Sequence, residues 1–78
     1  MARTLTIKPG LMLDTPEGVQ EIIYQYGPTC YLAHNYTVDD QGEKDLYTGS
    51  SYLTDREILR KYSDMMGHEY THLSWSEY

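Results

Sequence analysis

VQEIIYQYGPTCYLAHNYTV, residues 19–38, decides the fold of this 78-residue chain. Its two halves, residues 19–26 and 29–38, are rich in valine, isoleucine, threonine and tyrosine, which favour β-strands. Gly27-Pro28 separates the halves, so the stretch predicts an antiparallel hairpin. Alternation along the second half predicts one face made of Cys30, Leu32, His34 and Tyr36, opposite Tyr31, Ala33, Asn35 and Thr37.

Shorter strands are predicted on the N-terminal side of the hairpin. Residues 4–8 alternate polar and apolar side chains, and residues 11–14 form a second short run. Pro9-Gly10 and residues 15–18 (TPEG) are typical turn sequences, because proline restricts φ and glycine allows positive φ. We therefore expect two short strands that tight turns connect to the hairpin.

A further strand and one helix are predicted on the C-terminal side. Residues 39–44 are a polar loop, and residues 45–53 favour a strand with a bend or bulge at residues 49–51. Thr54 and Glu57 form a capping box for a helix that apolar spacing extends to about Met66, with Gly67 suited to its C-cap. The prediction is an α+β fold in a single domain, residues 1–78: a small, mainly antiparallel β domain with one helix after Thr54.

The turn spacing of IKPGLMLDTPEGVQEIIYQY, residues 7–26, resembles the opening of the small SH3-like barrels, including KOW-type modules. In these barrels a Pro-Gly turn leads into the first strand, and an acidic turn with glycine precedes the second. The resemblance implies an SH3-like barrel or a curled sheet. KOW modules that bind RNA or ribosomes are usually basic. This chain is acidic, so the resemblance does not extend to nucleic-acid binding.

The charge balance excludes several classes of function. Twelve Asp and Glu residues stand against six Lys and Arg residues, for a net charge of −6. Nucleic-acid backbones and anionic membranes bind basic patches, so we expect neither as a direct partner. No apolar run approaches the length of a membrane span or of a signal-peptide core. Cys30 is the only cysteine, which excludes a disulfide framework and indicates a reducing, cytoplasmic location.

His68-Glu69-Tyr70-Thr71-His72 spells H-E-x-x-H, the string that resembles the zinc site of zincin-type metalloproteases. On a helix, the two histidines lie one turn apart on one face and can bind zinc together. The resemblance implies that His68 and His72 are zinc ligands and that Glu69 is the general base. A minimal zinc-dependent hydrolase, with zinc as its cofactor, is therefore one alternative function.

Several features of the same segment count against a zinc site. Catalytic zinc needs a third protein ligand, and Glu77 is the only carboxylate that follows the motif. His34 would need an unusual upstream geometry. Residues 70–75 include several β formers, and on a strand His68 and His72 would lie about 13 Å apart. Near-helical apolar spacing also continues through the motif, so both helix and strand stay open for residues 67–75. We expect no catalytic residue, no metal and no cofactor.

Acidic and aromatic side chains gather in the first half of the chain. No lysine or arginine occurs from Pro9 to Glu43, and the whole chain has nine tyrosines and no phenylalanine. Tyrosine is enriched at protein interfaces because it combines an apolar ring with a polar tip. We predict a partner-binding surface that consists of Asp14, Glu17, Glu21, Tyr24, Tyr26, Tyr31, Tyr36, Asp39, Asp40 and Glu43.

The function predicted from these features is non-catalytic binding to a protein with a basic surface. Carboxylates that stand where phosphates would lie can mimic a nucleic-acid backbone and occupy the cationic site of a nucleic-acid-processing complex. The small size, acidity and composition also resemble the accessory proteins of bacteriophages, many of which inhibit host enzymes, which implies a location in the host cytoplasm. A structural or assembly role in a larger complex is a further alternative, and the oligomeric state stays open.

Overall fold

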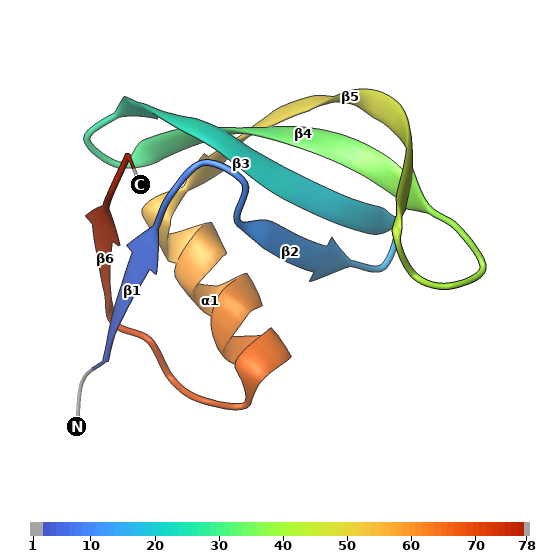
Figure 1. Cartoon of the computed structure of the whole chain (residues 1–78). Coiled ribbons are helices and arrows are strands. Elements are labelled where there is room, and N and C mark those ends of the chain that lie inside the picture. The colour runs from blue at the N-terminus through green and yellow to red at the C-terminus, as the bar shows by residue number, and fades with distance from the viewer. Residues whose placement is uncertain (1–2, 78) are drawn as a thin grey trace.

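An antiparallel meander of four strands is the main layer of the computed structural model, which describes residues 3–77. The strands lie in the order β2-β3-β4-β5 across the sheet (Figure 1). The elements in chain order are β1 (Thr4–Ile7), β2 (Met12–Thr15), β3 (Gly18–Gly27), β4 (Cys30–Val38), β5 (Lys44–Thr54), α1 (Asp55–Met66) and β6 (His72–Trp75). The predicted α+β composition with one helix after Thr54 is confirmed, as is the long hairpin, now β3 and β4.

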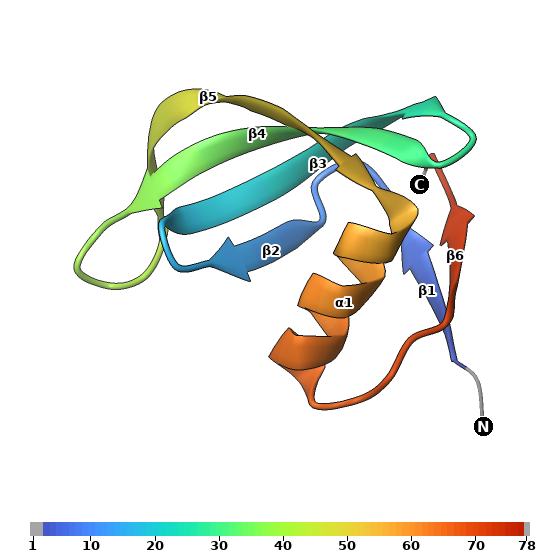
Figure 2. The same cartoon turned by 180° about the vertical axis from the view of Figure 1, so that it is seen from behind.

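Within residues 3–77, the covering elements all lie on one side of the sheet (Figure 1). Helix α1 and the two-stranded pair β1–β6 lie against the same face, and none of the elements between residues 3 and 77 covers the opposite face (Figures 1 and 2). The edge strands β2 and β5 do not pair with each other, so the sheet is open rather than closed into a barrel. Each face of the sheet therefore has a separate role.

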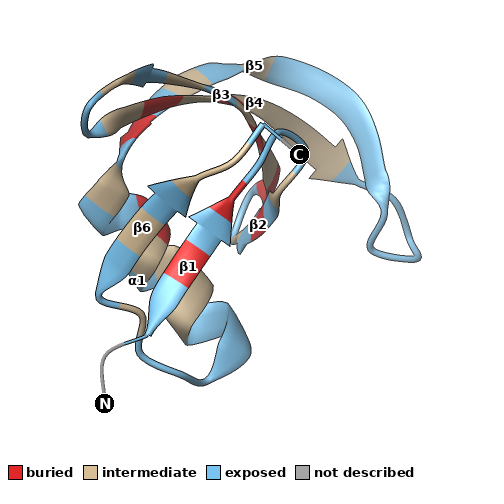
Figure 3. Cartoon of the chain, turned by 60° about the vertical axis from the view of Figure 1, so that its left-hand side comes forward, coloured by how far each residue is buried: buried red, intermediate tan, exposed pale blue. Residues whose placement is uncertain are grey.

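The inner face of the sheet forms the hydrophobic core with α1 and β1. Ile7, Leu13, Ile22 and Ile58 are fully buried, and they come from β1, β2, β3 and α1 respectively. Figure 3 shows buried positions alternating with exposed ones along β1. Each such side chain stabilises the fold by about 1.5–3 kcal/mol through removal of apolar surface from water. On β4, Tyr31 and Ala33 are buried, which confirms the predicted alternation.

Helix α1 begins and ends where the sequence predicts. The Thr54 hydroxyl accepts a hydrogen bond from the amide of Glu57, and the Glu57 carboxylate accepts one from the amide of Thr54. Gly67 closes the helix in the left-handed conformation, with φ at 71°, and its amide donates to the carbonyl of Ser63. Glycine adopts this conformation at little cost because it has no Cβ.

The segment after Gly67 is a loop followed by a strand. Residues 68–71 are irregular, and β6 then pairs in parallel with β1, with Leu73 opposite Leu5 and Trp75 opposite Ile7. The helix alternative for residues 67–75 is therefore wrong, and the strand alternative holds for His72–Trp75, after a cap and loop at residues 67–71. No helix within the described part of the chain is long and apolar enough to cross a membrane.

Candidate functional site

The uncovered face of the four-stranded sheet carries a layer of aromatic side chains. In one cross-strand row, Tyr24 of β3, Leu32 of β4 and Tyr52 of β5 lie side by side. The neighbouring row contains Glu21, His34 and Ser50, and the next contains Val19, Tyr36 and Tyr47. We call this surface the tyrosine face and define it by seven residues: Tyr24, Tyr26, Leu32, His34, Tyr36, Tyr47 and Tyr52.

Of the four register shifts in the sheet, two β-bulges bring Tyr24, Tyr47 and Tyr52 to the same face. An extra residue in β3, Ile23, separates Ile22 on the inner face from Tyr24 on the outer face. An extra residue in β5, Thr48, stands between Tyr47, which pairs with Tyr36, and Gly49, which pairs with Asn35. A bulge changes the phase of alternation in one strand, so residues beyond it exchange faces.

Ring contacts join the tyrosines into two clusters. Tyr26 lies 5.1 Å from Tyr52 and 6.2 Å from Tyr24, between ring centroids. The second cluster joins His34 to Tyr47 at 5.2 Å and Tyr36 to Tyr47 at 5.7 Å, both edge to face. Such pairs hold rings in defined orientations. The exposed fractions of Tyr26, Tyr47 and Tyr52 are nevertheless 61%, 55% and 60%, so large areas of these rings stay accessible.

One ion pair lies on the tyrosine face. The Lys44 ammonium nitrogen lies 3.0 Å from Oε1 of Glu21 and 4.6 Å from the centroid of the Tyr36 ring. The hydrogen bond to Glu21 raises the pKa of Lys44, and the negative charge of Glu21 makes a smaller contribution in the same direction. The ring of Tyr36 therefore already binds one cation through its face, by a cation–π interaction.

Carboxylates gather at the end of the sheet where the β2–β3 turn meets the β4–β5 loop. A pocket of about 520 Å³ is lined by Met12, Asp14 and Val19 on one side and by Gly42, Glu43 and Lys44 on the other. An adjoining pocket of about 360 Å³ includes Glu17. These pockets bring together the two segments that the sequence predicted to act jointly. We call this region the acidic end, and it consists of Asp14, Glu17, Asp39, Asp40, Glu43 and Asp45.

The members of the acidic end differ in what they already bind. Oδ1 of Asp39 accepts hydrogen bonds from the amides of Gln41 and Glu43, both at 2.9 Å, and so holds the loop together. The carboxylates of Asp40, Glu43 and Asp45 are exposed, and they form no hydrogen bond or ion pair with any other described residue. Unpaired exposed carboxylates at one end of a molecule attract cations from solution.

Tyr31, a predicted contact residue, lies in the core instead. It is 3% exposed on the inner face of β4, and its ring centroid lies 5.8 Å from that of Trp75 in β6. Burial raises the pKa of its hydroxyl, and the nearby negative charge of Asp55 adds to the shift. Tyr31 therefore does not belong to the predicted contact surface, because alternation along β4 places it on the inner face and Tyr36 on the outer face.

The histidines of the H-E-x-x-H string do not share a helical face. His68 and Glu69 are exposed in the loop after Gly67, and His72 begins β6. The Tyr70 amide donates to the Ser63 hydroxyl, and its ring packs edge to face on Tyr62 at 5.3 Å. This anchor turns the loop away from the helix axis. The helical geometry required by the zinc alternative is absent, and within residues 3–77 no three histidine, cysteine, aspartate or glutamate side chains converge as metal ligands.

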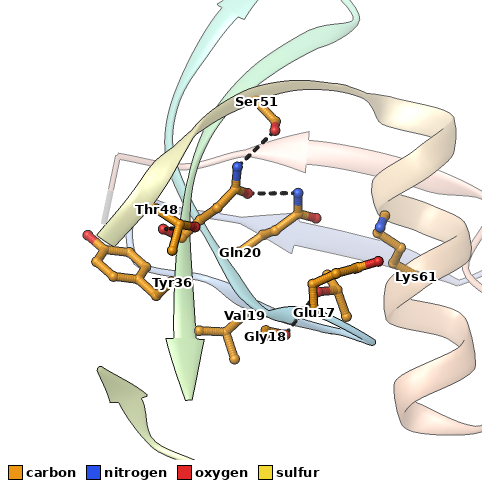
Figure 4. A pocket seen from close by; sticks show the side chains of 10 residues that line it. Glu17, Gly18, Val19, Gln20, Tyr36, Thr48, Ser51 and Lys61 are labelled. Carbon is orange, nitrogen blue, oxygen red and sulfur yellow. Dashed lines mark hydrogen bonds between the residues drawn. The ribbon is translucent and has the colours of Figure 1, made fainter. Parts of the chain in front are cut away.

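A polar pocket of about 290 Å³ lies on the inner side of the sheet (Figure 4). Gln20 Nε2 donates to Asn35 Oδ1 at 3.0 Å, and Asn35 Nδ2 donates to Ser51 Oγ at 2.9 Å, which links β3, β4 and β5. Glu17 and Lys61 also line the pocket. The buried Oε1 of Gln20 has no partner among the described residues. This amide network fixes the spacing of the three strands beneath the tyrosine face.

The sequence prediction missed several residues of the surface. Tyr47 and Tyr52 of β5 contribute two of its most exposed rings, His34 contacts Tyr47, and Asp45 extends the acidic end. The tyrosines of residues 45–53 were available as a signal. Strict alternation, however, places residues 47 and 52 on opposite faces of a strand.

Comparison with known proteins gave no match: no family model, no curated protein and no solved structure matches this chain.

Proposed function

We propose that this protein is a non-catalytic binding module that attaches to a basic surface of a partner protein. The observation that carries the proposal is the adjacency of the acidic end and the tyrosine face. Three carboxylates of the acidic end have no partner among residues 3–77, and the face beside them exposes tyrosine rings that no element covers. Carboxylates give charge complementarity, whereas tyrosine rings give contact area at small entropic cost.

The partner we propose is a protein whose cationic site binds nucleic acid. Lysine and arginine side chains that recognise phosphates can also pair with the carboxylates of the acidic end and stack on tyrosine rings. The module would then act as an inhibitor by mimicry of the nucleic-acid backbone. The proposal also includes a relation between this sheet and the SH3-like domains. It further places the action of the module in the cytoplasm of a host cell.

The test is capture of partners from a cell extract on the immobilised protein. The proposal expects a nucleic-acid-binding partner that is held at low salt and released both by high salt and by added duplex DNA or RNA. Retention that neither salt nor nucleic acid disturbs would contradict the mimicry, because a mimic and its target nucleic acid compete for one site.

Matched triple variants separate the acidic end from net charge. Asp40→Asn, Glu43→Gln and Asp45→Asn together remove three charges at the acidic end, and we expect them to abolish the capture. The control, Asp64→Asn, Glu69→Gln and Glu77→Gln, removes three exposed charges elsewhere and should retain it. Equal loss in both would show that only the overall charge matters.

A further inference from the structure

Strand β5 is the free edge of the four-stranded sheet. The other edge, β2, lies against α1, and the amide of Asp14 donates to the sulfur of Met65 at 3.3 Å. Eight of the 11 residues of β5 are exposed, and no described element lies along its outer side (Figures 1 and 3). An edge strand presents a row of backbone amides and carbonyls that can pair with another strand.

The edge of β5 has few of the features that prevent such pairing. Proteins protect edges with proline, charged side chains or bulges. β5 has two register shifts, one at Thr48 and one between Lys44 and Tyr47, but no proline, and its charged residues, Lys44 and Asp45, both stand at its start. The other nine residues, 46–54, are uncharged, and they include Leu46 at 65% exposure.

Charge decides which kind of strand fits this edge. A second copy of the chain would bring a net charge of −6 against another −6. Like charges oppose association, whereas a cationic strand would be attracted to the acidic end where β5 begins. Lys44 over the Tyr36 ring, at 4.6 Å, shows how a cationic side chain lies on the tyrosine face.

We propose that β5 is the docking edge for an extended segment rich in lysine or arginine, which adds to the sheet as a fifth strand. Alternate side chains of such a strand point to the same face of the sheet. One set would lie over Tyr47 and Tyr52 as cation–π pairs, and the first residues would reach Asp45 and Glu43. The inference rests on the proposed function and adds to it the conformation of the bound segment, which is the β-addition mode of peptide recognition.

The test uses two peptides of equal length and charge, (Arg-Thr)₄ and (Arg-Pro-Pro-Arg)₂. In the second peptide prolines occupy both odd and even positions, so donors toward β5 are missing whichever edge of the peptide faces the sheet. Because the second peptide cannot form several of the backbone hydrogen bonds to β5, we expect (Arg-Thr)₄ to bind at least about tenfold more tightly. Binding should also protect amides of β5 that exchange freely in the unbound protein, by about tenfold or more in hydrogen exchange.

A protein variant provides the second arm of the test. Tyr47→Ala removes a ring beside the edge and should weaken (Arg-Thr)₄ binding about threefold to tenfold, the range of a cation–π pair. The control, Met66→Ala, removes an exposed side chain at the far end of α1 and should leave binding unchanged.

The outcomes separate the two proposals. Equal binding of both peptides, with no new protection in β5, overturns docking at the edge but leaves the basic-partner function standing. Absence of binding by either peptide at low salt overturns docking and counts against the function as well. Protection of β5 that rises with protein concentration in the absence of peptide shows that a second copy occupies the edge, which also overturns the inference.

Discussion

The ammonium group of Lys44 in β5 lies 3.0 Å from the carboxylate of Glu21 in β3, so one ion pair spans the width of β4. Lys44 is the only cation in residues 39–45, a segment that otherwise carries four carboxylates. The pair therefore neutralises one charge of the tyrosine face and leaves the acidic end unneutralised. Exposed pairs of this kind contribute little to stability, so its main consequence concerns charged partners.

Replacement of Lys44 by glutamine should accelerate binding of a cationic peptide. The variant leaves Glu21 unpaired and makes the surface more negative, which raises the rate of electrostatically steered association. We expect an increase of about twofold to fivefold at low ionic strength in stopped-flow fluorescence, and none in molar salt, where charges are screened. Arg60→Gln, on α1, makes the same change in net charge. An equal increase with this control would contradict a local effect.

Replacement of Gly18 by alanine should strongly destabilise the fold. Gly18 has a φ of 150°, and a Cβ at this position would lie 2.0 Å from the carbonyl oxygen of Tyr36. Strained backbone and overpacking each cost about 1–3 kcal/mol, so we expect a loss of about 2–6 kcal/mol in urea denaturation.

Gly42→Ala is the matched control for Gly18→Ala. Gly42 also has a positive φ, 78°, but a Cβ there would meet no atom within 4 Å. We expect a loss of only about 1 kcal/mol, from the conformation alone. Similar losses in the two variants would mean that β3 and β4 can separate at Gly18 to accommodate the methyl group.

Tyr31→Phe should reduce the loss of stability in alkaline solution. Burial, and then the charge of Asp55, raise the pKa of Tyr31 in the folded protein above 10.0. The unfolded chain therefore releases this proton first as pH rises, so stability is retained below pH 10.0 and declines above it.

Phenylalanine keeps the packing on Trp75 and has no proton to lose. We expect Tyr31→Phe to match the parent protein within about 1 kcal/mol at pH 8. Above pH 10 the variant should gain on the parent by up to about 1.4 kcal/mol per pH unit, in denaturation curves at several pH values. Tyr26→Phe, at an exposed position, should follow the parent, and an identical alkaline decline in all three proteins would contradict the assignment to Tyr31.

Local signals in the sequence were sufficient for the helix and for the hairpin. The capping box at Thr54 and Glu57 and the glycine at position 67 specify the ends of α1 through contacts within a few residues. The turn at Gly27-Pro28 likewise acts on its neighbours. Each of these predictions depends on hydrogen bonds between residues close in sequence. Patterns of this short range can be recognised in one sequence without knowledge of the tertiary structure.

The composition of the surface depended on features that alternation does not reveal. The bulges at Ile23 and Thr48 arise from the pairing of three strands, and they place Tyr24, Tyr47 and Tyr52 on one face. The parallel pairing of β1 with β6 joins residues almost 70 positions apart, such as Thr4 and His72. Both the bulges and the parallel pairing are tertiary effects. The sequence therefore indicated tyrosine as the contact residue but did not show which tyrosines share one face of the sheet.

Zinc should not stabilise this protein, and replacement of His68 or His72 should not change its melting temperature. A metal that binds only the native state at a hundred times its Kd raises the free energy of unfolding by about 2.7 kcal/mol, which a thermal scan detects readily. His72 is the first residue of β6, with its Nδ1 2.9 Å from the hydroxyl of Thr71, whereas His68 lies in the preceding loop, so the helical alignment of two imidazoles is absent. We expect the same melting temperature with excess zinc, with a chelator, and for His68→Ala and His72→Ala. A zinc-dependent rise in melting temperature that either variant abolishes would instead support the metal site. Such a site would require the loop after Gly67 to refold around the ion.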